Sequence, residues 1–377
     1  MRRTSPSVVL LLTALAAAGC SDAPTGSPGE GPVASRAPAE QAPIYLVTFS
    51  DGVADVESAA RDIARNRGFA LRHVRRHAAR GFSAVIPPGQ IDAVRADPRV
   101  LIVERDGPVS LIEPIREQKR PGGGGGGQST PWGITRIGGA GDGTGKTAWI
   151  IDSGIDLDHP DLNTSRACHV NFASGRSADD GNGHGTHVAG TVAAKNNGID
   201  VVGVAANAYV CAVRVLGNSG SGTWEGVMNG INHVAANGRS GDVANMSLGG
   251  SGANATLEKA VSDAASKGIS FVLAAGNDGQ DADDFTPARV NGPNIYTISA
   301  IDSRGCLASW SNWGAPVDYA APGVSILSTR RGGGTTTMSG TSMAAPHVAG
   351  ILLLGGVRGD GFASCDSDGD PDPIAHR

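Results

Sequence analysis

Aromatic side chains are scarce in this sequence, and it contains no apolar run long enough to cross a bilayer. Phe, Trp and Tyr make up 4% of the 377 residues, and the apolar stretch near the N-terminus runs only from Val8 to Ala18. No basic segment interleaved with aromatic residues stands out, which argues against nucleic-acid binding. The 56 glycines follow no three-residue period, which excludes a collagen-like chain. With 40% hydrophobic residues, the chain can bury a sizeable folded core.

The N-terminus has the pattern of an export signal. Two arginines precede the apolar run, which is followed by the letters GC, with Cys20 last. This arrangement predicts a signal peptide over residues 1–19. The end of the signal is similar to a bacterial lipobox, so we expect Cys20 to carry a lipid anchor; the alternative is ordinary cleavage beside an incidental cysteine. Residues 20–42 are rich in Pro, Ser, Gly and Ala, which predicts a disordered tether.

The remaining cysteines are few and even in number. They are Cys168, Cys211, Cys306 and Cys365. In an exported chain an even number favours two disulfides, for which three connectivities are open. Reduced cysteines in the core are the alternative.

Residues 43–113 alternate between strand-like and helix-like patterns. IYLVTF, ALRHVRRH, GFSAVIP and VLIVERD are strand-like, and two helical segments lie among them. The order β-α-β-β-α-β is that of a small ferredoxin-like α+β domain. Residues 114–130 follow and include six consecutive glycines, which predicts a flexible linker open to proteases.

Residues 131–357 predict a different architecture. Strand-like TAWIID, VCAVRVL, GDVANMSL and SFVLAAG alternate with helical stretches at residues 186–195, 224–237 and 254–267. Such alternation predicts an α/β domain with a mostly parallel sheet and helices on both faces. Residues 358–377 carry alternating aspartates but lack the glutamate of an EF-hand loop, so we expect a solvated acidic tail.

Three segments of the α/β domain place a reactive side chain at the end of a strand or the start of a helix. Asp152 follows an apolar strand, and His184 and Ser342 each lie close to a glycine just before a helix. In a parallel sheet such positions converge on one edge. A serine hydroxyl becomes a nucleophile when an imidazole takes its proton, and a buried carboxylate orients that imidazole. We therefore expect Ser342 to be the nucleophile, His184 the general base and then acid, and Asp152 the orienting group.

A fourth polar residue, Asn277, follows another apolar strand, where its amide could stabilise an oxyanion. Structural alternatives exist for each residue alone. Asp152 could cap a strand end, His184 and His187 could bind a metal, and Ser342 could cap a helix. Only a catalytic site accounts for all of these positions together.

Five motifs extend this interpretation. DSGID, HGTHVAG, NMSLGG, AAGN and GTSMAAPHVAG occur in that order between residues 130 and 355. Together they resemble the subtilisin family of serine proteases (subtilases), nearest to the proteinase K branch, which shares the order Asp, His, Ser. The resemblance implies a secreted, monomeric serine endopeptidase that needs no cofactor for catalysis. HVAG occurs twice because both segments begin helices beside the family's active site, where His187 and His347 are expected to make structural hydrogen bonds.

The resemblance also implies how a substrate binds. Two edge segments would hold an extended peptide, a third would floor the primary pocket, and Trp224 would line an outer apolar pocket or simply pack in its helix. The small, uncharged pocket lining predicts cleavage after large hydrophobic or aromatic residues. The edge segments are Gly220, Ser221, Gly222 and Ser247, Leu248, Gly249, and the floor is Ala274, Ala275 and Gly276.

By the same resemblance, residues 43–113 are similar to an inhibitor-I9 propeptide, with GFSAVIP and VLIVERD as the best-matching phrases. Such a unit assists folding and then inhibits the enzyme until it is removed. We expect self-cleavage within residues 114–130. Because Cys20 lies on the propeptide side, the precursor would be lipid-anchored at the bacterial envelope, and the mature enzyme would be extracellular.

The resemblance further suggests an ion and a disulfide pattern. Pro293, Ile295 and Asp318 match a structural calcium site built from two backbone carbonyls and a carboxylate, ligands that suit Ca²⁺. Cys168 and Cys211 would lie on neighbouring strands of the family's sheet, which favours a disulfide between them. Cys306 would then pair with Cys365.

The sequence leaves two alternative functions open. AGDGTGKT, residues 140–147, fits a permissive phosphate-loop pattern, but such a loop must follow a strand and open a helix. Here it precedes the strand TAWIID. The second rival is a catalytically inactive, lipid-anchored binding protein with the subtilase fold, against which the intact catalytic positions argue.

Overall fold

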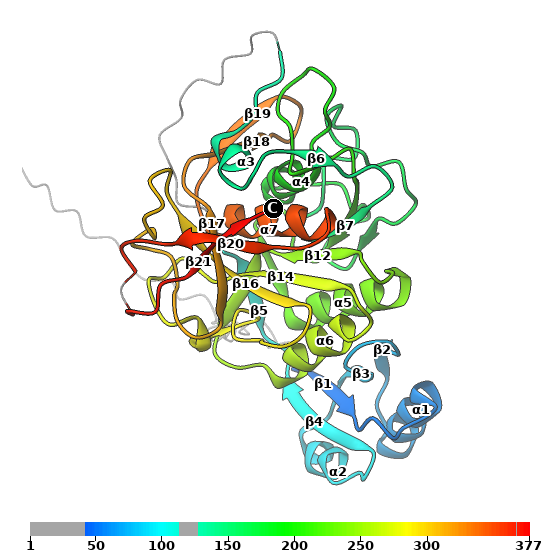
Figure 1. Cartoon of the computed structure of the whole chain (residues 1–377). Helices are drawn as coiled ribbons and strands as arrows, with labels where there is room; N and C mark the ends of the chain where they lie inside the picture. The colour runs from blue at the N-terminus through cyan, green and yellow to red at the C-terminus, as the bar shows by residue number, and fades with distance from the viewer. Residues whose placement is uncertain (1–41, 113–126, 367) are drawn as a thin grey trace, which may run out of the picture. The chain divides into compact units, whose positions relative to one another are not determined.

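Nine strands form the largest sheet (Figure 1). The computed structural model describes residues 42–112, 127–366 and 368–377. All adjacent strands in this sheet are parallel, except that β20 is antiparallel to β21. In order across the sheet, the strands are β20 (Arg358–Phe362), β21 (Pro373–His376), β17 (Val317–Pro322), β16 (Ile295–Ile301), β14 (Ser270–Ala274), β12 (Val243–Met246), β7 (Thr147–Asp152), β10 (Tyr209–Arg214) and β8 (Val170–Asn171).

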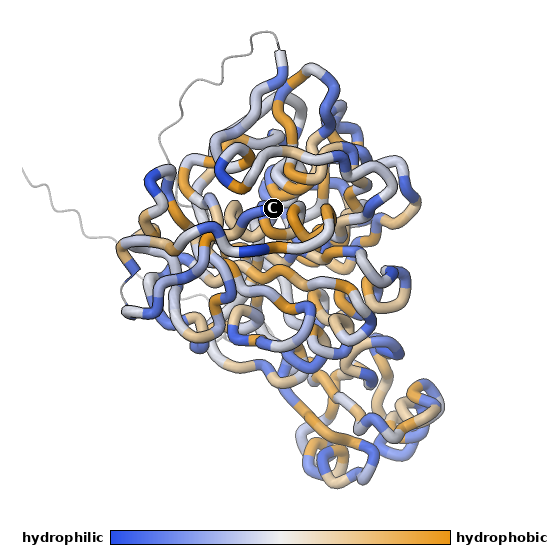
Figure 2. Tube along the Cα trace, in the orientation of Figure 1, coloured by the Kyte–Doolittle hydropathy of each residue, from blue (hydrophilic) through white to orange (hydrophobic). Residues whose placement is uncertain are grey.

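Helices cover both faces of this sheet, as predicted. They are α4 (His184–Ala193) and α7 (Thr341–Leu353) on one face, and α5 (Trp224–Asn237) and α6 (Ala255–Ala265) on the other. Successive residues of a strand point to opposite faces. In β7, Ile150 accordingly packs with side chains of α4 and α7, and Ile151 with those of α5 and α6. Figure 2 shows apolar residues concentrated in the central strands and in α7.

Residues 44–105 have the predicted ferredoxin-like order. The elements are β1 (Ile44–Phe49), α1 (Val56–Arg67), β2 (Leu71–Arg75), β3 (Gly81–Val85), α2 (Ile91–Arg95) and β4 (Val100–Arg105), with a short 3-10 turn at Pro88–Gln90. The antiparallel sheet order is β2-β3-β1-β4. Asp55 caps α1 by accepting from the Ser58 N–H, and Gly68 ends the helix with φ 72°. This unit has its own apolar core, which includes Phe49, Ile63 and Phe82.

A second four-stranded sheet joins residues 108–111, which follow the ferredoxin-like unit, to strands of the larger part of the chain. Its order is β11-β5-β13-β15, and all of its strand pairs are antiparallel. The strands are β5 (Pro108–Leu111), β11 (Ser221–Thr223), β13 (Leu248–Ser251) and β15 (Phe285–Thr286). The smaller elements of the catalytic part are α3 (Trp132–Arg136), β6 (Gly141–Asp142), β9 (Ala205–Ala206), a 3-10 turn at Ala282–Asp284, β18 (Ile326–Thr329) and β19 (Thr335–Met338).

The C-terminal residues differ from the solvated tail that the sequence predicted. Strands β20 and β21 form a hairpin, and β21 pairs with β17 at the edge of the main sheet. Ile374 and Ala375 are buried in this position. Asp372 is buried as well and accepts a hydrogen bond of 2.5 Å from Ser299 Oγ. The acidic composition of residues 358–377 predicts exposure to solvent, whereas the apolar residues near their end determine where they lie.

Two disulfides join Cys168 to Cys211 and Cys306 to Cys365, the pairing that the resemblance implied. The second disulfide ties the loop after β16 to the C-terminal hairpin. Residues 140–147 connect β6 to β7 without opening a helix, so the phosphate-loop alternative lacks the structure it requires. Over the described ranges, the longest helices are too short or too polar to span a membrane.

Candidate active site

Asp152 and His184 meet at the carboxyl edge of the main sheet. Asp152 is the last residue of β7, and His184 is the first residue of α4. His184 Nδ1 lies 2.9 Å from Asp152 Oδ1 and 3.0 Å from Oδ2, and both side chains are buried. A buried carboxylate against Nδ1 fixes the tautomer of the imidazole, so that Nε2 is the nitrogen that can accept a proton.

Ser342 lies in the first turn of α7, buried at the N-terminal end of the helix. Its Oγ is 3.1 Å from the carbonyl oxygen of Ile112 and 3.4 Å from that of Ser247. The hydrogen bonds that hold Ser342 were not predictable from the sequence motifs. Ser247 Oγ accepts a hydrogen bond from Asn245 Nδ2 and donates one to the Ser342 carbonyl, at 2.9 and 3.1 Å.

Asn277 follows β14 and lies against the start of α7. Its Oδ1 accepts from the backbone N–H of Thr341 at 2.9 Å and from Thr341 Oγ1 at 3.0 Å. Because a backbone N–H can only donate, this contact sets the amide orientation, with the oxygen facing Thr341. The NH₂ group therefore points away from Thr341, the residue that precedes Ser342.

An extended segment of the chain lies across this site. Strand β5 is held between β11 and β13, with Val109 opposite Gly222 and Ser110 opposite Gly249. The Leu111 N–H donates to the Gly220 carbonyl at 2.8 Å. The two expected edge segments are thus brought together around a peptide backbone, in the manner of β-strand addition. Sequence reasoning did not predict β5, because four residues carry too little periodicity.

A cavity of about 410 Å³ opens beside this segment. Its lining includes Ala274, Ala275, Gly276, Leu248 and Gly249, which are five of the residues expected to bind substrate. Gly276 has φ 117°, and a Cβ at this position would clash with the side chain of Asn312. The floor of the cavity therefore depends on a glycine.

Trp224 lies at the outer end of the same segment. It is 7% exposed and belongs to one buried cluster with Val109 and Leu111. Its backbone N–H donates to the Gly107 carbonyl at 3.1 Å. The indole thus lies against Gly107 of the extended segment, and its role as the wall of an outer substrate pocket stays a prediction.

The other histidines of the repeated HVAG segments are structural. His187 Nε2 lies 3.0 Å from the Ile326 carbonyl, and His347 Nδ1 lies 2.9 Å from that of Met343. Burial lowers the pKa of His187 to about 3 and that of His347 to about 4. Both rings therefore stay neutral at ordinary pH. The metal pair considered for His184 and His187 does not form, because His184 is held by Asp152 instead.

The expected calcium ligands lie on neighbouring parts of the sheet. Pro293 precedes β16, Ile295 begins it, and Asp318 lies in the adjacent strand β17. Asp318 Oδ2 accepts the Thr297 N–H at 2.8 Å, and burial raises the pKa of this carboxyl. A partly desolvated carboxylate is a ligand that a hard cation accepts. No cluster of three or more His, Cys, Asp or Glu side chains suited to a metal occurs in the part of the chain that the structure describes.

Residues 44–106 contact helix α5 through the buried carboxylate of Glu225, which no sequence motif pointed to. Glu225, in the first turn of α5, accepts from Arg72 Nε and Nη2, both at 3.0 Å, and faces His73 Nδ1 at 3.0 Å. Ser83 Oγ donates to the same carboxylate. Burial alone would raise the pKa of Glu225, but the hydrogen bonds from His73, Arg72 and Ser83 outweigh it and lower the pKa to about 2.

Other polar contacts reinforce this interface. Asp106 Oδ1 accepts from the Glu225 N–H at 2.9 Å, and Glu104 accepts from Ala255 and Thr256 N–H at 3.0 and 2.9 Å. These carboxylates occupy the N-terminal ends of α5 and α6, where unpaired N–H groups favour negative charge. Asn232 Oδ1 accepts from the backbone of the loop after β2.

Comparisons with known proteins agree with this geometry. The model described as "Subtilase family" matches residues 143–355. The chain is 42% identical to "Alkaline serine exoprotease A" of Vibrio alginolyticus over 74% of its own length and 52% of the relative's. It is 41% identical to "Alkaline protease" of Alkalihalobacillus alcalophilus over 72% of its own length and 68% of the relative's. The chain thus spans about half of the first relative and two thirds of the second.

A solved structure supports the same assignment. "Crystal structure of a cold adapted subtilisin-like serine proteinase" is 39% identical, with a TM-score of 0.58, over 65% of this chain and 97% of that one. The family match includes Asp152, His184, Asn277 and Ser342. The chain belongs to the subtilase family of serine proteases.

Proposed function

We propose that this chain is a serine endopeptidase in which Asp152, His184 and Ser342 act together. The observation that carries the proposal is the carbonyl of Ile112, part of an extended segment in the cleft, 3.1 Å from Ser342 Oγ. A peptide held in this way has its carbonyl within reach of the nucleophile, and proximity of this kind is a main source of catalysis. No cofactor takes part.

The proposed reaction uses each of these groups in turn. Ser342 Oγ bonds to the carbonyl carbon while its proton passes to His184 Nε2, and Asp152 stabilises the resulting imidazolium. The carbonyl oxygen becomes an oxyanion, and the NH₂ group of Asn277 is its donor. The C–N bond then breaks as His184 returns the proton to the departing amine. Water repeats the same steps on the acyl-enzyme and releases the acid.

The orientation of Asn277 supports this role. Its oxygen is held by the Thr341 N–H, next in the chain to the nucleophile. The same amide therefore has its donor end turned away from Thr341 and fixed before the reaction. Donors fixed before the reaction stabilise the developing charge more effectively than mobile water.

We further propose that the protein is made as a zymogen with residues 43–112 as an I9-type inhibitor. Two features support this: β5 fills the cleft, and Glu225 holds the small unit on α5. The carbonyl of Ile112 at Ser342 favours self-cleavage after Ile112, just before the range 114–130 that the glycine-rich sequence suggested. Ile112 and a cavity lining that is mostly small and apolar, with Asp278 as its one acidic residue, also support a preference for large hydrophobic or aromatic residues before the cleaved bond.

The finer assignments complete the proposal. The motifs resemble the proteinase K branch most, and residues 1–41, which include Cys20, lie outside the described residues. A lipid anchor at Cys20 would keep the precursor at the envelope, and cleavage after Ile112 would release the catalytic part as an extracellular monomer. Protein and peptide substrates are the partners that this geometry fits.

The deciding experiment compares the full chain with Ser342→Ala and with Ser303→Ala, an exposed serine that serves as control. Mass spectrometry over time would follow the intact chain, together with hydrolysis of a peptide ending in an aromatic residue before its reporter group. We expect the wild type and Ser303→Ala to split after Ile112 and then to hydrolyse the peptide. Ser342→Ala should do neither.

Other outcomes separate the alternatives. If the wild type stays intact and inert with calcium present, the inactive binding protein becomes the better description. If Ser342→Ala is cleaved at the same rate as the wild type, another protease performs the processing.

A further inference from the structure

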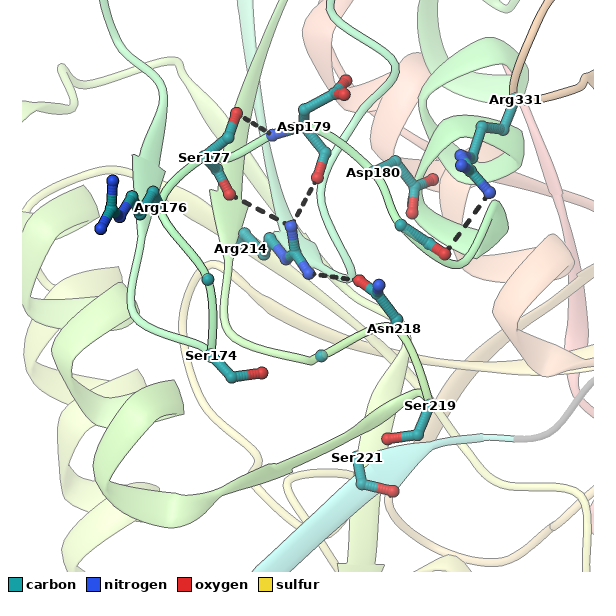
Figure 3. Close-up of a pocket in the computed structure, with 13 residues that line it drawn as sticks. Ser174, Arg176, Ser177, Asp179, Asp180, Arg214, Asn218, Ser219, Ser221 and Arg331 are labelled. Atoms are coloured by element: carbon teal, nitrogen blue, oxygen red, sulfur yellow. Dashed lines mark hydrogen bonds between the residues drawn. The ribbon is translucent and has the colours of Figure 1, made fainter.

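A polar groove of about 650 Å³ lies beside the edge strand β11 (Figure 3). The loop of residues 174–181 forms one wall, and the turn from Gly217 to Ser221 forms the other. Arg176, Arg214 and Arg331 all line it. The groove shares no lining residue with the cavity beside Ile112, so it is a separate feature.

The floor of the groove holds a buried positive charge. Arg214 is 6% exposed, and its guanidinium donates to the carbonyls of Ser177 and Asp179 at 3.1 and 2.7 Å. It also donates to the Leu216 carbonyl and, at 2.7 Å, to Asn218 Oδ1 (Figure 3). All four acceptors are neutral. Among the described residues, no carboxylate oxygen lies within 4.0 Å of this guanidinium.

The acidic residues of the groove do not compensate this charge. Asp179 Oδ1 accepts from the Leu157 N–H at 3.2 Å, on the far side of its loop. Asp180 is buried, and its carboxylate accepts from Ser153 Oγ and from the first turn of α4. Arg331 donates only a long hydrogen bond of 3.5 Å, to the Gly181 carbonyl. A partly desolvated positive charge without a counter-charge favours an anion.

The groove lies next to the place where a substrate backbone would bind. Ser221 lines the groove and is the first residue of β11, directly opposite Ser110 of β5. Opposite residues of an antiparallel pair share a face, with Cβ atoms about 4.5–5.5 Å apart. Ser110 and Ser221 are both exposed. Ser110 itself lines the cavity beside Ile112, and a longer side chain at its position starts on the face that it shares with Ser221, the neighbouring residue that lines the groove.

We propose that this groove is a specificity subsite for an acidic side chain, carried by the substrate residue that takes the place of Ser110. That residue is the third before the cleaved bond when Ile112 is the residue that precedes it. The inference rests on the proposed endopeptidase function and specifies its substrate class. A Glu carboxylate in the groove meets the field of Arg214 and of the exposed Arg176 and Arg331. The chain's own Ser110 leaves the groove unfilled.

The test uses the self-processed wild-type enzyme and three anilides, Val-X-Leu-Ile, with Glu, Gln or Lys at X. The sequence copies residues 109–112, so only the third position differs. Exposed charge pairs contribute about 0.2–1 kcal/mol, which corresponds to a kcat/KM ratio of up to about fivefold for Glu over Gln. We expect a ratio of at least about threefold, Lys to be the poorest, and the ratio to fall as salt rises.

The double variant Arg176→Gln/Arg331→Gln should bring the Glu-to-Gln ratio toward one. Arg239→Gln/Arg304→Gln removes the same charge from exposed residues elsewhere and should keep the ratio. Equal hydrolysis of the Glu and Gln peptides by the wild type would overturn this inference but not the proposed function. An unchanged Glu-to-Gln ratio in Arg176→Gln/Arg331→Gln would do the same. If all three peptides resist the wild type, the proposed function fails and this inference with it.

Discussion

Asp180 illustrates how a side chain outside the reacting trio positions the site. Its carboxylate accepts from the Gly183 and Thr186 N–H groups and from Ser153 Oγ, at 2.9, 3.0 and 3.0 Å. Ser153 Oγ in turn accepts from the Gly185 N–H at 3.1 Å. These bonds tie the start of α4 to the end of β7 on both sides of His184. An acidic residue before a helix is a recognisable N-terminal signal, so the sequence did contain this information.

The role of Asp152 leads to the first prediction. Asp152→Asn should keep the fold but present an amide to His184 Nδ1, which favours the wrong tautomer of the ring. We expect kcat to fall on the order of 10⁴-fold, the size of the same Asp→Asn change in the chymotrypsin-type triad, with KM little changed. Steady-state kinetics on enzyme processed in trans, with thermal unfolding as a check on folding, would measure it. A loss below tenfold would mean that His184 is oriented by other groups.

Asp318 leads to a second prediction, about calcium. Its raised pKa reflects a carboxylate that burial leaves poorly solvated, so a bound cation should stabilise the native state. With calcium at a hundredfold excess over its dissociation constant, the gain is about 2.7 kcal/mol. We expect calcium to raise the Tm of the wild type relative to EDTA, and Asp318→Asn to remove that rise. An equal rise in both proteins would place any calcium elsewhere.

At the scale of the element, the strands and helices of the main sheet were predictable because their periodicities are strong. TAWIID became β7, and the helix expected at residues 224–237 is α5 with the same bounds. The short strands were not predictable. Strand β5 exists because β11 and β13 hold it on either edge, and β21 because β17 offers an open edge. Pairing with distant segments leaves no mark on a stretch of four residues.

Strand β21 supports the third prediction. Ile374 is 4% exposed in a cluster with Ile301 and Leu307, so Ile374→Ala should cost about 2–4 kcal/mol of unfolding free energy. Ile199→Ala, at a residue that is 41% exposed, is the matched control and should cost below about 1 kcal/mol. Urea denaturation of the Ser342→Ala background avoids self-digestion. Equal losses in both variants would mean that the hairpin contributes little to the fold.

At the scale of the whole molecule, carboxylates placed at helix ends contribute to holding the small unit. Glu104 and Asp106 accept hydrogen bonds from backbone N–H groups at the N-termini of α6 and α5. In the opposite direction, the side chain of Glu225 in α5 pairs with Arg72 and His73 of the small unit. Apolar packing accompanies these polar contacts, because Leu46, Ala78 and Ala79 of the small unit belong to one buried cluster with side chains of α5 and α6. Such an interface suits an inhibitor that first occupies the cleft and later dissociates, because the affinity of the small unit depends on the ionisation of a few groups.

The fourth prediction concerns pH. The pKa of Glu225 is about 2 in the docked state, whereas a released Glu225 regains its ordinary value near 4.5. The ionised carboxylate therefore favours docking fully above pH 4.5, and this contribution is lost as pH falls from there toward 2. We expect the dissociation constant of the small unit to rise at least about tenfold between pH 6 and pH 3. Ser342→Ala protein, cut at a site inserted within residues 113–126, would supply the complex for this measurement.

Glu225→Gln separates this carboxylate from the others at the interface. Burial raises the pKa of Asp106, so its protonation favours docking as pH falls and opposes the contribution of Glu225. The variant should bind its small unit more weakly than the parent at pH 7, because Arg72 loses its counter-charge. Its affinity should also change less between pH 6 and pH 3. A pH profile as steep as that of the parent would mean that Glu225 is not the source of the acid sensitivity.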